Sequence, residues 1–435
     1  MSVSGLTLPF VSTADPDTNA EGGLDPLGLA GLADRLANEI APEVTARMRR
    51  LRFVTAMAAC ASLLVEPADT LGPDGTPAYL AFEWLIVEAL VRKRPASGVT
   101  GVPGSDLAAR RVRDHRRHLN ATSYLNTPKV FGFHGVYKRI ARDLRVVDDR
   151  FRLDQNGHEL LRAWEQDTGL SGFVDRRAKT DGGRLADEIF RQVRSATERG
   201  EVQLGHTSRW WPEISAAFGP GEAGPSERRL LTSYLDDEQH PIRTELVRLV
   251  ATAAGTEEDE RAMVTRFAET SGISAGLSMR LDAILAYEAL VRRIADVFTL
   301  TRLSSTQAPG TRLKPETVAG HEHVATVAKA LPALYLRAVE AMAVLGLDAE
   351  LENQLGSFRD EYKPAQLVEA VLDRHDTVQS RKGKRSWFER DGQGFVVRGI
   401  GSADGAFEPS EELIHPYRLY ALRRFCQDLS TGRHQ

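Results

Sequence analysis

The chain has 435 residues, of which 42% are apolar and 27% are charged, and its formal net charge is -4. This composition is typical of an ordinary folded protein with two or three domains, and it argues against a disordered chain. A slightly acidic protein does not coat nucleic acid by bulk charge, so any such binding must be local.

The cysteines and the hydropathy of the sequence indicate in which cellular compartment the protein is expected. Cys60 and Cys426 lie far apart in apolar helical patterns, which predicts no disulfide framework and favours a reducing cytoplasm. Residues 1–24 lack the basic start and apolar core of a signal peptide and are expected to be a flexible lead-in. The longest apolar stretch contains Glu83 and Glu88 and is too short to cross a bilayer, so no membrane segment is predicted.

An N-terminal helical region is expected over residues 25–95, where apolar residues recur at helical spacing. A linker rich in proline and glycine follows. Basic residues then gather between Arg92 and Arg142, where Asp106 and Asp114 are the only acids. The first part of this band predicts a strongly basic helix from Ser105, its N-cap, to about Leu119.

The next helix is expected from His134 to Val146, because Val136, Ile140 and Leu144 recur every four positions and share one face. The opposite face carries His134, Lys138, Arg139, Arg142 and Arg145. Two short extended runs, 146–147 and 151–153, are joined by a polar turn that is typical of a hairpin. Helical spacing then resumes after Gly157.

This order of basic helix, small hairpin and helix resembles the winged-helix DNA-binding proteins, whose last helix starts with a pattern like that of Leu153, Gly157, Leu160 and Leu161. The resemblance covers about a tenth of the chain. It implies a winged-helix unit over residues 105–175, in which a basic recognition helix enters a DNA groove and the wing touches phosphates.

A helical connector is expected over residues 176–225 and a helical C-terminal domain over residues 226–435. Near its end, two short strand-like runs around Asp391-Gly392 predict a β-hairpin. The expected fold class is therefore mainly α, made of helical domains with a winged-helix unit and a small C-terminal β-hairpin. A basic loop precedes the hairpin and is suited to phosphate contact and stacking, although a solvated surface loop explains it equally well.

The predicted DNA-binding residues come from both basic elements. They are Arg110, Arg111, Arg113, Arg116, Arg117, Lys129, His134, Lys138, Arg139, Arg142, Arg145, Arg381, Lys382, Lys384, Arg385 and Trp387. A basic helix face that is merely solvated, or a winged helix that binds protein, would give the same pattern.

Catalytic patterns are sparse. No phosphate-binding loop, serine-hydrolase elbow or zinc-protease motif occurs in the sequence. Asp360, Glu361 and Lys363 could hold a divalent ion in a nuclease, but acids at a charged helix end are usually solvated. The pair of His115 and His118 lacks a carboxylate or cysteine to complete a metal site. We therefore expect no catalytic residue, metal or cofactor.

Two parts of the sequence, residues 127–144 and residues 382–392 with 415–422 downstream, also look like uncharacterised bacterial proteins encoded beside phage-defence or DNA-modification genes. The sequence thus predicts a cytoplasmic, non-catalytic DNA-binding adaptor or specificity subunit of a bacterial multiprotein complex, acting in antiviral defence. Its expected partners are duplex DNA and other proteins, not a membrane. The alternatives are a metal-dependent DNA nuclease, a winged-helix scaffold for proteins and a transcription regulator.

Overall fold

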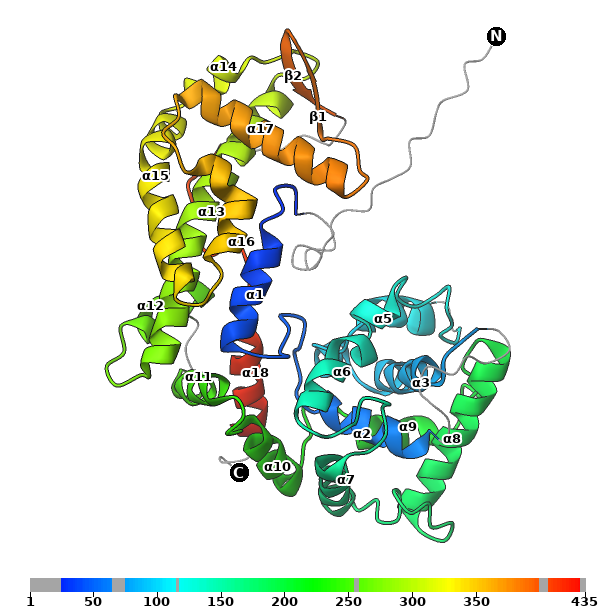
Figure 1. The fold of residues 1–435 in the computed structure, drawn as a ribbon. Coiled ribbons are helices and arrows are strands. Elements are labelled where there is room, and N and C mark those ends of the chain that lie inside the picture. Colours follow the sequence, from blue (N-terminus) through cyan, green and yellow to red (C-terminus); the bar gives the residue numbers. More distant parts are fainter. Residues whose placement is uncertain (1–24, 65–74, 115–116, 254–257, 399–405, 431–435) are drawn as a thin grey trace, which may run out of the picture. The chain divides into compact units, whose positions relative to one another are not determined.

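The structure is a computed structural model that describes residues 25–64, 75–114, 117–253, 258–398 and 406–430. Most of these residues lie in helices, and the described part of the chain also contains one two-stranded antiparallel sheet (Figure 1). The expected mainly α class with a small C-terminal hairpin is therefore confirmed. None of the described helices has the length and apolar character needed to cross a membrane.

The chain forms two compact units, and each unit is assembled from separate parts of the sequence. Among the described residues, unit 1 combines residues 25–40 with those from 258 to 417. Unit 2 combines residues 41–253 with 418–430. This grouping differs from the five consecutive segments expected, because the apolar faces of the first and last helices are buried against helices remote from them in sequence.

Unit 2 holds the predicted DNA-binding band. Its helices are α2 (Phe53–Leu63), α3 (Ala78–Lys93), α4 (Ser105–Ala109), α5 (Pro128–Phe131), α6 (Phe133–Asp143), α7 (Gln155–Thr168), α8 (Asp181–Arg199), α9 (Trp210–Ala217), α10 (Pro225–Leu235), α11 (Pro241–Thr252) and α18 (Leu419–Ser430). Short 3-10 and π-helical turns span Ala96–Val99 and Arg110–Asp114.

The core of unit 2 is built around α2 and α3, which are buried along almost their whole length. Helix α2 packs against α6 and α7, and α3 packs against α8 and α9. The buried carboxylate of Glu227 on α10 accepts hydrogen bonds from Arg52 at 3.2 Å and from the Thr55 hydroxyl at 2.6 Å. Helix α18 lies beside α10 and α11, where Leu422 and Phe425 are fully buried (Figure 1).

Unit 1 is organised by one long helix. Its elements are α1 (Ala30–Ile40), α12 (Glu260–Ala268), α13 (Ala275–Gln307), α14 (Pro315–Ala319), α15 (Glu322–Ala343), α16 (Asp348–Leu355), a 3-10 turn (Gly356–Phe358), α17 (Pro364–Arg381), β1 (Phe388–Asp391) and β2 (Gly394–Val397). Helices α13 and α15 run side by side (Figure 1). Glu288 of α13 accepts hydrogen bonds from the Ile414 amide at 2.6 Å and the Tyr417 hydroxyl at 2.8 Å, which holds the last segment of this unit.

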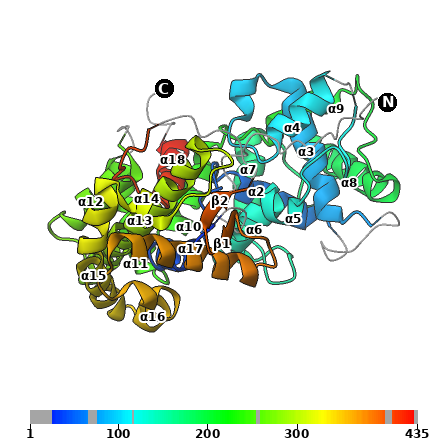
Figure 2. The same ribbon diagram turned by 90° about the horizontal axis from the view of Figure 1, so that it is seen from above.

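The predicted C-terminal hairpin is confirmed. Strands β1 and β2 pair antiparallel with Phe388 opposite Val397 and Asp391 opposite Gly394. Gly394 has φ +138°, and a Cβ there would lie 2.3 Å from the Leu313 carbonyl oxygen, so glycine is required. Arg390 of β1 binds Asp373 and Asp376 of α17, and Figure 2 shows the hairpin against that helix.

The region compared with winged helices has the expected order of elements but no strands. Helix α6 is followed by a single antiparallel bridge between Val147 and Leu153, and then by α7. Gly157 allows α7 to approach this turn, because a Cβ there would lie 2.1 Å from the Val146 carbonyl oxygen. The apolar pattern is buried as expected, but the winged-helix unit itself stays a prediction.

The basic helix expected from Ser105 to about Leu119 begins at the expected residue but is shorter than expected. Helix α4 ends at Ala109 and a short π-helical turn follows, while residues 117–119 are not helical. Few apolar anchors support a longer helix here. Instead, Glu88 of α3 accepts the Leu119 backbone N–H at 2.9 Å, so this amide has its partner outside any local helix.

Candidate nucleic-acid interface

Helix α6, the predicted recognition helix, is held at its N-terminus by a buried acid. The carboxylate of Glu83 on α3 accepts the His134 backbone N–H at 3.1 Å and the Tyr124 hydroxyl at 2.6 Å. Gly132 precedes the helix, and a Cβ there would lie 2.2 Å from Oε1 of Glu83. Burial raises the pKa of Glu83 to about 7, against the lowering effect of these hydrogen bonds.

The predicted apolar face of α6 is confirmed, because Val136, Ile140 and Leu144 are all buried. The assignment of His134 to the exposed basic face is wrong. This imidazole is only 5% exposed and stacks on Tyr79 with ring centroids 3.8 Å apart. Burial, followed by the charge of Lys138, lowers the pKa of His134 to about 3, so the ring is neutral and offers no positive charge to DNA.

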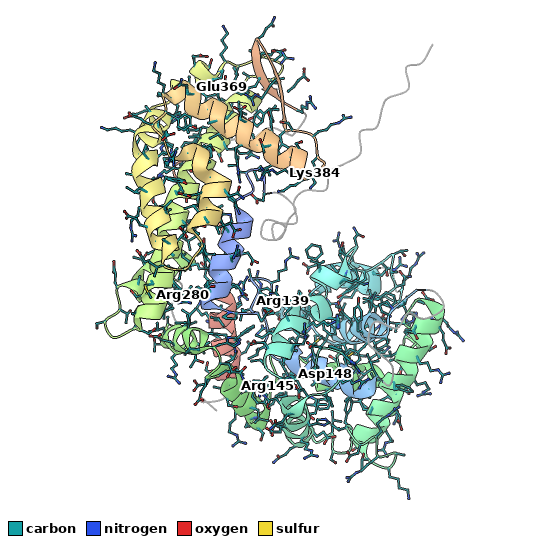
Figure 3. All side chains as sticks on the ribbon, in the orientation of Figure 1. Arg139, Arg145, Asp148, Arg280, Glu369 and Lys384 are labelled. Carbon is teal, nitrogen blue, oxygen red and sulfur yellow. The ribbon has the colours of Figure 1, made fainter. Side chains whose placement is uncertain are left out.

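Two of the remaining cations of α6 are exposed and paired with acids. Arg139 binds Glu43 at 2.6 Å, and Arg142 binds Asp149 in the turn that follows the helix. Arg145 lies just after the end of α6, where its side chain is exposed and its backbone has φ +53°. Figure 3 labels both Arg139 and Arg145. Lys138 is half-buried. These ion pairs reduce the positive charge that α6 presents.

The basic residues before α6 divide into surface and structural groups. Arg110, Arg117 and Lys129 are exposed, whereas Arg111 is half-buried. Arg113 donates to the Val91 carbonyl at 2.8 Å and to the Arg94 carbonyl, so it fastens its segment to α3. Arg116 lies outside the described residues.

A group of arginines that the sequence reasoning missed lies in unit 2. We define the arginine cluster as Arg49 and Arg50, in the turns before α2, with Arg423 and Arg424 on α18. Arg50 binds Asp428 of α18, which joins the two segments. Desolvation, then the charges of Arg49, Arg50 and Arg423, lower the pKa of Arg424, so these like charges act on one another. The signal for the cluster was present as two Arg-Arg pairs at opposite ends of the sequence.

Helix α6 supports the arginine cluster through its buried face. The hydroxyl oxygen of Tyr137 accepts the backbone N–H groups of Arg49 and Arg50, both at 2.9 Å. Gly101 has φ +84° and packs against the same segment, since a Cβ there would lie 2.7 Å from Cβ of Arg49. The backbone of this arginine pair is therefore fixed from two sides. Guanidinium groups can bind phosphate oxygens through two parallel hydrogen bonds.

The basic loop of unit 1 is exposed at its four cations. Arg381 ends α17, and Lys382, Lys384 and Arg385 follow it in the loop where Figure 3 labels Lys384. Lys382 donates to the Asp25 carbonyl at 2.5 Å. Trp387 is half-buried, and its ring packs 5.3 Å from His375 and 5.8 Å from Phe298. Trp387 therefore packs against neighbouring aromatic rings of unit 1.

The structure assembles no metal centre from its described part, because no group of three or more His, Cys, Asp or Glu side chains is placed there to hold an ion. Asp360 and Glu361, which were considered for a nuclease, are exposed. Asp360 contacts Arg359 at 3.7 Å.

Comparisons with protein-family models, curated proteins and solved structures found no match to this chain.

Proposed function

We propose that this protein is a non-catalytic DNA-binding subunit that holds the phosphate backbone on the arginine cluster of unit 2. The observation that carries the proposal is the convergence of Arg49, Arg50, Arg423 and Arg424 from opposite ends of the chain. Asp428 offsets part of the positive charge of this cluster, and a phosphate group, which fits the guanidinium group, could offset more of it. The sequence suggests that the protein acts as an adaptor or specificity subunit in a bacterial complex.

The exposed cations Arg110, Arg117, Lys129 and Arg145 add positive surface to the same unit. A protein of net charge -4 then binds DNA locally and with strong dependence on salt. The proposal also accommodates the ion pairs of α6, because it does not require that helix to read bases in a groove.

The test is a titration of labelled duplex DNA at several salt concentrations, with wild type and the variant Arg423→Ala/Arg424→Ala. Losing two phosphate contacts should lower the slope of log affinity against log salt by about 1.8 units. The matched control is Arg194→Ala/Arg199→Ala on α8, which removes the same charge from exposed positions. Wild-type affinity that is independent of salt would favour a protein scaffold, and magnesium-dependent strand cleavage would favour a nuclease.

A further inference from the structure

Helix α15 of unit 1 exposes apolar side chains on the face that its neighbours leave uncovered. The helix packs against α13, α16 and α17, and its buried face includes Val324, Leu331 and Tyr335 (Figure 1). On the other face, Leu336 and the helix-ending Val344 are each 59% exposed, the largest fraction for any large apolar side chain of the described residues. Exposed apolar side chains that share one face are typical of a surface that binds another protein.

A stripe of exposed residues runs along this face of α15, because its members recur at intervals of three or four. They are Ala325, Lys329, Ala333, Leu336, Glu340 and Ala343. Lys329 and Glu340 are the two charged members, and neither forms a hydrogen bond or an ion pair within the described part of the chain. They lie about 16 Å apart along the helix, so they cannot pair with each other.

The order of residues along the stripe matches itself when it is reversed. In an antiparallel pair of α15 helices centred between residues 334 and 335, Lys329 of each copy faces Glu340 of the other. The same register places Ala333 opposite Leu336, so a small side chain meets a large one, as interlocking helices require. A two-fold axis makes each of these contacts occur twice. A parallel pair would instead place each charge opposite its own kind, which is unfavourable.

We propose that the exposed face of α15 binds a second copy of this chain as an antiparallel, two-fold symmetric helix pair. The match of charge and of side-chain size in one register selects a second copy as the occupant, because the stripe is complementary to itself. One helix from each copy buries a small area, so we expect a reversible dimer in the micromolar range. This dimerisation goes beyond the proposed DNA binding and does not depend on it.

The test is sedimentation velocity of the full chain over a range of micromolar concentrations, without DNA. Lys329→Glu and Glu340→Lys each place like charges opposite each other at two points, and each should weaken the dimer by roughly tenfold or more. An equimolar mixture of these two variants should dimerise like wild type, because every reversed charge then faces an opposite charge. Leu336→Glu should abolish the dimer, because it places a charge in the apolar centre of the pair.

The matched controls are Lys363→Glu and Glu361→Lys, which make the same charge changes at exposed positions outside α15 and should leave the dimer unchanged. Thermal melts should show that all variants fold, because every altered side chain is exposed.

Three outcomes would overturn the proposal. A wild type that is monomeric throughout the micromolar range would assign the stripe to a helix of another protein. A dimer that Lys329→Glu and Leu336→Glu leave unchanged would form through a different face. A mixture of the charge variants that fails to restore the dimer would exclude the antiparallel register. Duplex titration enters none of these outcomes, so the proposed DNA binding is decided separately.

Discussion

Glu83 is a buried carboxyl group that joins three parts of unit 2 through the hydrogen bonds of His134 and Tyr124. A carboxyl at the start of α6 also faces the positive end of the helix dipole. The folded protein nevertheless holds the proton of Glu83 up to a pKa of about 7, because burial disfavours the charged form. His134, on α6, responds in the opposite direction, since burial keeps its ring neutral down to a pKa of about 3.

Glu83 and His134 make the free energy of unfolding change with pH in opposite directions. From pH 4.5 to about 7, Glu83 binds a proton in the folded state but not in the unfolded state, so its contribution falls as the pH rises. From pH 6.5 down to about 3, His134 binds a proton only in the unfolded state, so its contribution falls as the pH falls. The two slopes oppose each other between pH 4.5 and 6.5.

Glu83→Gln should therefore change how the free energy of unfolding depends on pH. Removing the Glu83 carboxyl leaves the His134 contribution, so stability should rise from pH 4.5 to 6.5 by about 1.4 kcal/mol per unit relative to wild type. His134→Phe should show the reverse slope. Urea denaturation at several pH values measures both, and parallel curves for all three proteins would contradict this account.

At the scale of the element, α6 has two different faces. Its buried face packs on α2 and places the Tyr137 hydroxyl beneath the backbone of Arg49 and Arg50. Its exposed face carries the cations that the sequence assigned to DNA, among which Arg139 and Arg142 have acidic partners. The helix therefore supports the arginine cluster whether or not its own cations contact DNA.

Two variants separate the faces of α6. Ile140→Ala should lower the free energy of unfolding by about 2–5 kcal/mol, because it truncates a fully buried side chain. Lys138→Ala/Arg142→Ala should change stability by about 0.5 kcal/mol or less and weaken duplex binding if this face contacts phosphates. Thermal melts and duplex titrations measure both effects. Retained duplex affinity in the surface variant would assign binding to other residues of unit 2.

At the scale of the whole molecule, each unit carries its own basic surface. Unit 2 has the arginine cluster, and unit 1 has the loop of Arg381, Lys382, Lys384 and Arg385. One chain with two DNA contacts gains affinity from the raised effective concentration of the second contact after the first has formed. The gain requires a duplex long enough to reach both surfaces.

Neutralising the four loop cations should therefore remove the advantage of long duplexes over short ones. Affinity for short duplexes should stay nearly unchanged, because the arginine cluster of unit 2 is intact in this variant. A series of duplex lengths, titrated with wild type and the variant, measures the effect. If both proteins show the same length dependence, the loop is a solvated surface or a site for a protein partner.

The sequence by itself determined the local elements. The period of Val136, Ile140 and Leu144 identified the buried face of α6, and the Asp391-Gly392 turn identified the hairpin, because both patterns depend on neighbours in the chain. Periodicity overestimated the length of the helix that begins at Ser105, because the Leu119 amide bonds to the remote Glu88 instead. It also misplaced His134, whose partner Tyr79 comes from α3.

Only the tertiary structure decided which distant residues meet. The arginine cluster and the stacked rings of His118 and His206 each join segments that are separated in sequence, and α18 completes a unit whose other helices end before residue 258. Such groupings follow from the burial of apolar faces across the whole chain, which no local pattern encodes. The residues were visible in the sequence as Arg-Arg pairs and acids within apolar helices, but their partners were not.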